Sequence, residues 1–257
     1  MKSLKQKFIR NDAVLGTMIS EFATPNLVRM LQTAGFEFAI VDCEHGYFDF
    51  SQIAAMVAVG NGFSMPVLTR IPVAEREYIT KVLDMGGDGV LVPMVNTADD
   101  ARKVVEYAKY VPLGKRGLST TRAHTNYNPP PLKEYLPGAN ERTMVLVQIE
   151  TAQAVENAME IAAVDGVDAL MIGPNDLAAD FGYPGDLETD AMFAAIDRVV
   201  SATRESGTVC GMLASKLSYL QRCRERGMKI FGCGSEVGML MKAAKSTVVD
   251  FHGWHND

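Results

Sequence analysis

Two carboxylates follow short apolar runs in the second half of this chain. Glu150 ends the run Met144-Val-Leu-Val-Gln-Ile-Glu150, and Asp176 ends Ala169-Leu-Met-Ile-Gly-Pro-Asn-Asp176. Runs of this length that are rich in Val, Ile, Leu and Met are typical of buried parallel strands. A carboxylate at the end of such a strand lies at the rim where strand–helix folds bind their ligands. Two carboxylates on successive strands are placed to share a divalent cation.

Three further ionisable residues end or follow earlier predicted strands. Asp42 ends the predicted strand 36–42, His45 follows it, and Arg70 ends the predicted strand 66–70. Taken singly, each has an ordinary structural explanation, because Asp often caps helices, His often makes a structural hydrogen bond, and Arg forms ion pairs at barrel rims. Together on one rim they are the parts of a metal-assisted carbonyl site.

The residue types indicate which metal and which reaction such a site would support. Glu150 and Asp176 offer hard oxygen ligands, which suit Mg²⁺ or Mn²⁺ better than a closed zinc site, with Co²⁺ and Zn²⁺ as alternatives. A 2-oxo acid would fill two open positions on the metal, which would stabilise its enolate. Arg70 would neutralise the developing charge. His45, oriented by Asp42, would move a proton.

The segment that contains Asp176 offers a second kind of ligand contact. The backbone N–H groups of Gly173, Asn175 and Asp176 are expected to bind a substrate carboxylate, as anion-binding loops at helix starts do. An aldolase that works through a Schiff base needs a lysine inside the barrel, and the interiors of the predicted strands contain none. The residues therefore favour metal-assisted chemistry.

Helices and strands are predicted to alternate along the chain. A helix that begins at Thr24-Pro25 and ends at Gly35 separates the first two strands, and similar helical patterns follow the others. The alternation breaks at 112–137, which is predicted to be a long loop, and loops of this length in compact domains are usually functional or disordered. This pattern predicts an α/β fold, a single (β/α)₈ barrel over residues 1–257, with an open doubly wound sheet as the alternative. The predicted strands are 14–19, 36–42, 66–70, 89–93, 144–150, 169–173, 208–213 and 229–233.

Composition is consistent with a single barrel that acts on small molecules. The chain has 257 residues, of which 47% are hydrophobic, and that is the usual size of one such domain. The formal net charge is −6 with both signs interspersed, which argues against a nucleic-acid partner. There is no apolar run long enough for a membrane span and no secretory signal pattern, and the four cysteines lack metal-like spacing. We therefore expect a cytoplasmic protein with reduced thiols.

Six motifs together resemble the HpcH/HpaI class II pyruvate aldolases. The resemblance extends over about Gly16 to Ala244, with the motifs in family order. It implies a barrel of the phosphoenolpyruvate/pyruvate type that reversibly cleaves a 4-hydroxy-2-oxo acid into pyruvate and an aldehyde. The motifs are Val41-Asp42-Cys-Glu44-His45, Arg70, Leu91-Val-Pro93-Met94-Val95, Gly114-Lys-Arg116-Gly117, Val147-Gln148-Ile-Glu150-Thr151 and Gly173-Pro-Asn-Asp176-Leu177.

The same resemblance assigns expected roles to individual residues. It implies a homohexamer, a dimer of trimers, in which the last helix packs on a neighbouring subunit. The expected partners are a 2-oxo acid and an aldehyde. The implied roles are metal binding by Glu150 and Asp176, proton transfer by His45 with Asp42, enolate stabilisation by Arg70, a lining role for Gln148, and a border of the aldehyde pocket at Leu213.

Two departures from the family pattern leave the aldehyde open. The family often has Gly-x-Asp after the eighth strand, whereas this chain has Gly234-Ser235-Glu236, and relatives differ in substrate at the segment 119–127. A CoA-ester lyase of the citrate-lyase-β or malyl-CoA type is the alternative within enzymes, but no basic cluster is committed to a nucleotide. A non-catalytic binding barrel is the other alternative, and the presence of all four charged site residues argues against it.

Overall fold

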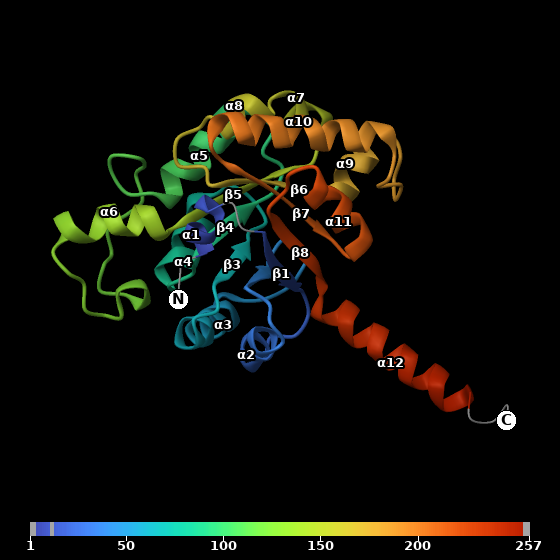
Figure 1. Cartoon of the computed structure of the whole chain (residues 1–257). Coiled ribbons are helices and arrows are strands. Elements are labelled where there is room, and N and C mark those ends of the chain that lie inside the picture. The colour runs from blue at the N-terminus through green and yellow to red at the C-terminus, as the bar shows by residue number, and fades with distance from the viewer. Residues whose placement is uncertain (1–3, 11–12, 254–257) are drawn as a thin grey trace.

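Eight parallel strands close into a barrel in the computed structural model, which describes residues 4–10 and 13–253. The strands pair in chain order, and the last pairs with the first. The predicted (β/α)₈ barrel is therefore confirmed (Figure 1). The strands are β1 Val14–Ile19, β2 Phe38–Asp42, β3 Val67–Arg70, β4 Gly89–Val92, β5 Met144–Ile149, β6 Ala169–Ile172, β7 Val209–Ala214 and β8 Ile230–Ser235.

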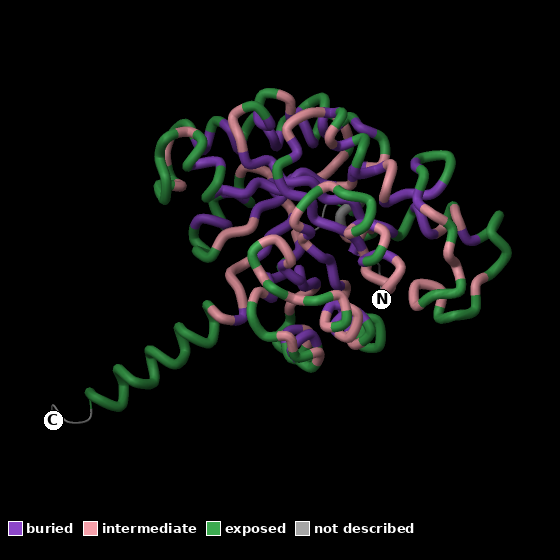
Figure 2. The backbone as a smooth tube through the Cα atoms, turned by 180° about the vertical axis from the view of Figure 1, so that it is seen from behind, coloured by how far each residue is buried: buried purple, intermediate pink, exposed green. Residues whose placement is uncertain are grey.

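Most of the helices pack around the outside of the barrel, whose strands form the buried centre of the molecule (Figure 2). The exceptions are α6, which lies to one side, and α12, which extends away from the body (Figure 1). No helix in the described part of the chain is long and apolar enough to cross a membrane. The helices are α1 Leu4–Ile9, α2 Asn26–Thr33, α3 Phe50–Phe63, α4 Arg76–Asp84, α5 Ala98–Ala108, α6 Leu132–Arg142, α7 Ala152–Glu156, α8 Ala158–Ala162, α9 Pro174–Asp180, α10 Asp190–Ser206, α11 Leu217–Glu225 and α12 Glu236–Gly253, with a 3₁₀ turn, η1, at Ala123–Thr125.

The alternation of side chains along the strands explains where the polar residues emerge. On β5, Met144 and Leu146 belong to the apolar cluster inside the barrel, whereas Val145 and Val147 pack outward against the helices. Side chains two residues apart on a strand share a face. Gln148 therefore continues the interior row one layer above Leu146. By the same rule Asp42 follows Phe38 and Ile40, and Arg70 follows Leu68. The carboxyl ends of the strands thus place polar groups on top of an apolar plug.

Several boundaries differ from those the sequence predicts. Helix α3 continues through Asn61-Gly62, a pair that is typical of a helix end, to Phe63. Glycine is useful at Gly60 because a Cβ there would lie 2.5 Å from Val67, so the helix can approach β3 closely. The predicted loop 112–137 also ends early, because α6 begins at Leu132 and includes Pro137. The segment after β6 contains the short helix α9, which begins with Pro174 at its first position.

The junction between β8 and α12 is tied to the loop that follows β1. Glu236, which is 5% exposed, accepts hydrogen bonds from the backbone N–H groups of Ser20 at 2.9 Å, Glu21 at 2.6 Å and Phe22 at 3.0 Å. This glutamate occupies the place where the resemblance predicts aspartate. Its carboxylate satisfies three donors at once, so the loop after β1 is held against the seam that closes the barrel.

Candidate active site

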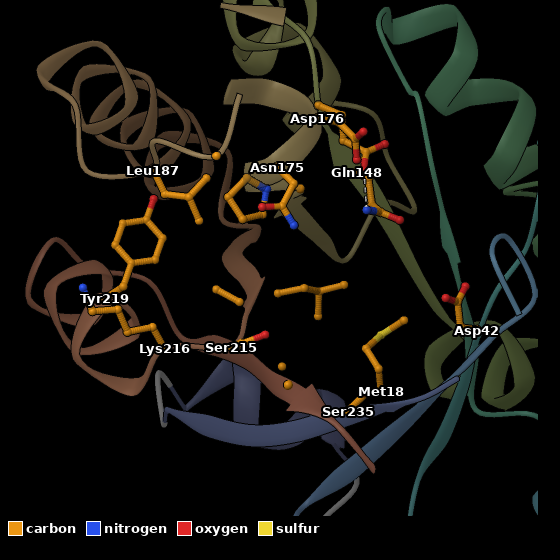
Figure 3. Close-up of a pocket in the computed structure, with 18 of the residues that line it drawn as sticks. Met18, Asp42, Gln148, Asn175, Asp176, Leu187, Ser215, Lys216, Tyr219 and Ser235 are labelled. Atoms are coloured by element: carbon orange, nitrogen blue, oxygen red, sulfur yellow. Dashed lines mark hydrogen bonds between the residues drawn. The ribbon is translucent and has the colours of Figure 1, made fainter. Parts of the chain in front are cut away.

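A cavity of about 640 Å³ lies at the carboxyl ends of the strands, where barrel enzymes carry their active sites. Its walls combine residues from the carboxyl ends of β1, β2, β3, β5, β7 and β8 with residues from the segments after β6 and β7 (Figure 3). All of the predicted site residues except His45 line it. These are Asp42, Arg70, Gln148, Glu150, Gly173, Asn175, Asp176 and Leu213.

Asp42 and Arg70 form a buried, two-point ion pair. They are direct partners in the parallel pairing of β2 with β3. Arg70 Nε donates to Asp42 Oδ1 at 2.8 Å, and Nη2 donates to Oδ2 at 2.7 Å. The remaining Nη1 lies 2.9 Å from Glu44 Oε2. Because all three guanidinium nitrogens contact carboxylate oxygens, the guanidinium has a fixed orientation and its charge stays in the cavity wall.

This pairing differs from the expected relation between Asp42 and His45. The backbone N–H of His45 donates to Asp42 Oδ1 at 3.4 Å. The carboxylate therefore binds the backbone of the loop and does not orient the imidazole ring. The His45 side chain is exposed and makes no hydrogen bond with the residues that the structure describes. The assignment of His45 as a proton carrier oriented by Asp42 stays a prediction, and within one chain the geometry assigns Asp42 to Arg70.

Glu150 is a carboxylate held at both oxygens. It is 3% exposed, Oε2 accepts from the backbone N–H of Met94 at 3.0 Å, and Oε1 accepts from Gln148 Nε2 at 2.7 Å. Burial raises the pKa of Glu150 to about 7, opposed by the Met94 N–H and by Arg70, and the carboxylates of Glu44 and Asp176 raise it further. A nearby cation would therefore favour its charged form.

The segment after β6 shapes the wall beside Glu150. A Cβ at Gly173 would lie 2.3 Å from Glu150 Oε1, so glycine leaves the carboxylate room that any other residue would fill. The expected use of the Gly173 N–H for substrate is not met, because it donates to the carbonyl of Ile149 at 3.2 Å. The first turn of α9 still offers the N–H groups of Asn175 and Asp176, which a helix leaves without intrahelical partners.

These groups fit a hard divalent cation. Gln148 Oε1 is buried and has no hydrogen-bond partner among the described residues. The Gln148 side chain lies next to Glu150, to which its Nε2 donates, and Asp176 lines the same cavity. No group of three or more His, Cys, Asp or Glu side chains suited to a metal occurs in residues 4–10 and 13–253. The candidate donors are therefore two carboxylates and an amide oxygen, a set that would leave positions on the ion for substrate and water.

The other side of the cavity contains residues that the sequence did not single out. Leu187, Ser215, Lys216 and Tyr219 line it, opposite Asp42 (Figure 3). They come from the segments after β6 and β7, in which no strand periodicity marks a side chain as facing the cavity. The position of Lys216 shortly after a strand end is the one signal that could have found it.

Neither of the two candidate covalent nucleophiles has a suitable environment. The Lys216 ammonium is 2.6 Å from Glu188 Oε1 and its side chain is 68% exposed, so it lacks the burial that activates a Schiff-base lysine. Burial raises the pKa of the Cys43 thiol to about 12, and Asp42 adds to the effect, so a thiolate is disfavoured. The four cysteines are all free thiols, as predicted.

The sequence matches the family model described as HpcH/HpaI aldolase/citrate lyase over residues 17–243. The chain belongs to this family. The match covers the barrel from β1 into α12 and therefore includes every strand end that contributes to the cavity.

Named relatives and a solved structure are similar over nearly the whole chain. The hydroxypyruvate/pyruvate aldolase of Roseovarius nubinhibens is 34% identical over 99% of this chain and 97% of the relative. The 4-hydroxy-2-oxo-heptane-1,7-dioate aldolase of Escherichia coli is 35% identical over 86% of this chain and 84% of the relative. The crystal structure of an HpcH/HpaI aldolase from Desulfitobacterium hafniense has a TM-score of 0.93 at 32% identity and covers 98% of this chain and 97% of its own.

The Asp42–Arg70 pair makes a testable contribution to stability. Arg70→Met leaves the buried Asp42 carboxylate and the half-buried Glu44 carboxylate without their cation, so the free energy of unfolding should fall by about 3 kcal/mol or more in urea titrations. Arg76→Met, at an exposed arginine outside the cavity, should change it by less than about 0.5 kcal/mol. Adding Asp42→Asn to Arg70→Met should recover part of the loss. Equal, small losses in the two single variants would contradict the assigned pairing.

Proposed function

We propose that this protein is a divalent-metal-dependent class II aldolase. It cleaves a 4-hydroxy-2-oxo acid reversibly into pyruvate and an aldehyde. The observation that carries the proposal is the grouping, in one cavity, of two carboxylates with a fixed guanidinium. Membership of an aldolase family and the names of its relatives support the reaction type.

Each charged group has a role that its geometry supports. Glu150 and Asp176 would hold the ion, with Mg²⁺ or Mn²⁺ favoured by the oxygen donors and Co²⁺ or Zn²⁺ as alternatives. A divalent ion there supplies Lewis-acid polarisation of the ketone. Arg70, already fixed by Asp42, stabilises the charge that develops on the enolate oxygen without having to reorient. Gln148 donates to Glu150 and lines the cavity, and Leu213 borders the space left for the aldehyde.

Proton transfer is assigned to His45. It is a histidine on the loop that leaves β2, and it is next in sequence to Glu44, whose carboxylate contacts Arg70. Its side chain is exposed and has no competing hydrogen bond with the described residues. The ring is therefore available to a substrate, either directly or through water.

The chain is proposed to work as a homo-oligomer in which α12 packs on a neighbouring subunit, as hexamers of this family do. Glu236 is the buried residue of this helix, and the rest of its length projects from the body (Figure 2). An uncovered helix of this kind gains little stability alone. A second copy of the chain is the occupant that would cover its apolar side chains, which include Met239, Leu240, Met241, Val248 and Val249.

The alternatives fit the cavity less well. A CoA-ester lyase would need cations for the nucleotide phosphates, but the two basic residues that line the described cavity, Arg70 and Lys216, are both paired with carboxylates. A non-catalytic barrel would have no use for a buried carboxylate such as Glu150. We also place the protein in the cytoplasm, where free thiols persist.

The reaction can be tested by pyruvate release from a panel of 4-hydroxy-2-oxo acids, coupled to lactate dehydrogenase. Chelator-treated protein should lose activity, and Mg²⁺ or Mn²⁺ should restore it, because the proposed site provides only two carboxylates and one amide oxygen for the ion. Full activity in excess chelator, with borohydride trapping of substrate on a lysine, would overturn the metal mechanism. Turnover of CoA esters alone would favour the lyase, and binding without turnover would favour the non-catalytic barrel.

His45→Ala separates proton transfer from metal binding. The cleavage rate should fall by roughly a hundredfold, in line with general acid–base catalysis. Mn²⁺ affinity and melting temperature should stay close to those of the original chain, because the ring is exposed and is not a metal ligand. All three quantities are measured on one preparation. An unchanged rate per folded molecule would remove His45 from the reaction.

The oligomer can be tested by light scattering on the full chain. The measured mass should be several times the 28.0 kDa of one chain. Leu240→Asp combined with Val249→Asp places charges on the projecting helix and should lower that mass, whereas Lys245→Glu, at a position already charged, should not. A single-chain mass for the unmodified protein would contradict the proposed assembly.

A further inference from the structure

The turn that follows β4 contains a methionine in a backbone conformation that favours glycine. Met94 has φ of 54°, in the left-handed region that side chains other than glycine seldom adopt. Its own side chain is 52% exposed, so burial of that side chain does not explain the conformation. Residues held in such regions persist where the surrounding structure over-determines them, and they cluster at functional sites.

The conformation aims the Met94 N–H at Glu150. That N–H donates to Oε2 at 3.0 Å, while the Gln148 amide donates to Oε1 at 2.7 Å. Each carboxylate oxygen therefore has one donor and keeps lone-pair capacity for another partner. The Gly173 backbone, where a Cβ would lie 2.3 Å from Glu150 Oε1, limits movement of the carboxylate on a third side.

The turn is fastened to the segment that carries Glu150. The Val95 N–H donates to the carbonyl of Gln148 at 3.3 Å. The Thr151 hydroxyl donates to Asn96 Oδ1 at 2.5 Å, and Asn157 Nδ2 donates to the carbonyl of Asn96 at 2.9 Å. The turn after β4 and the exit of β5 are thus joined at several points. Displacing Met94 would disturb the carboxylate directly.

We propose that Met94 is a positioning residue whose strained backbone presets the Glu150 carboxylate for the divalent ion. This inference rests on the proposed function, because it presumes that Glu150 is a ligand. The backbone N–H is the active part, and the unbranched side chain matters because it permits the left-handed conformation that a β-branched residue resists. A ligand that neighbouring groups already hold in the binding orientation does not have to reorganise when the metal binds, so the metal binds more tightly.

The test measures Mn²⁺ affinity of the full chain by calorimetry, without turnover. Met94→Val should raise the Kd by at least about tenfold, the lower end of losses seen when groups that orient metal ligands are removed. Met94→Ala keeps a side chain that tolerates the turn, and its Kd should rise much less than that of Met94→Val. Asn96→Ala loosens the turn without changing residue 94 and should also weaken binding.

Ser64 provides a matched control. It has φ of 55° and caps the end of α3, away from the cavity. Ser64→Val introduces the same backbone conflict, so its melting temperature is compared with that of Met94→Val. Its Mn²⁺ affinity should stay within about twofold of that of the original chain, since outer-shell effects on a metal are local. If both valine variants weaken binding equally, the effect is general destabilisation and the inference fails.

The remaining outcomes are also decisive. Unchanged Mn²⁺ affinity in Met94→Val would overturn the positioning role, and so would a loss in Met94→Ala as large as that in Met94→Val, which would assign the effect to the side chain. If Met94→Val does not fold, Asn96→Ala decides, because unchanged affinity there overturns the inference. An original chain that binds no Mn²⁺ would overturn the metal site itself, and that result is distinguishable from the others.

Discussion

A carboxylate buried on top of an apolar barrel has to be held without losing its charge, and this constraint shapes the whole site. Glu150 is 3% exposed, so it has lost nearly all contact with water. The Met94 N–H, the Gln148 amide and the charge of Arg70 replace part of that hydration. Burial still raises the pKa of Glu150 to about 7, which means that the protein donors alone do not compensate fully. A divalent cation would supply the rest. The proposed ion would thus bind at the carboxylate that these donors already hold in place.

The residues at strand ends were predictable because the strand itself determines where they point. Side chains alternate along a strand, so Asp42, Arg70 and Gln148 had to follow the interior apolar rows. Their partners were not predictable. The short spacing between Asp42 and His45 favoured a pair between them, whereas the pairing of β2 with β3 sets Asp42 beside Arg70. Which residues of neighbouring strands lie side by side is decided only when the barrel folds. The sequence spacing of residues at the end of one strand therefore does not predict their partners on the next strand.

The missed helix α6 has a similar cause. Helix α6 contains Pro137 and weak periodicity, so local sequence argued for a loop. In the structure, Lys109 donates to the carbonyls of Asn140 and Thr143 at the end of this helix. The Asn140 side chain also exchanges two hydrogen bonds with the backbone of Tyr110, at 2.7 and 2.9 Å. These contacts join residues about 30 positions apart. Tertiary contacts of this kind override a weak local preference, and no window along the sequence contains both partners.

The two sides of the cavity differ in how they are built, and this difference bears on substrate choice. The proposed acid-binding side rests on strand ends that hydrogen bonds to neighbouring strands hold in place. The opposite side includes Leu187 and Lys216, which lie on loops after β6 and β7, and Tyr219, which is buried in α11. Loops on a fixed barrel can change without disturbing the chemistry below them. Relatives can therefore share one reaction on pyruvate and differ in the aldehyde. Tyr219 lines this opposite side of the cavity. Its buried hydroxyl has no hydrogen-bond partner among the described residues and is therefore free to bind a polar group of the aldehyde.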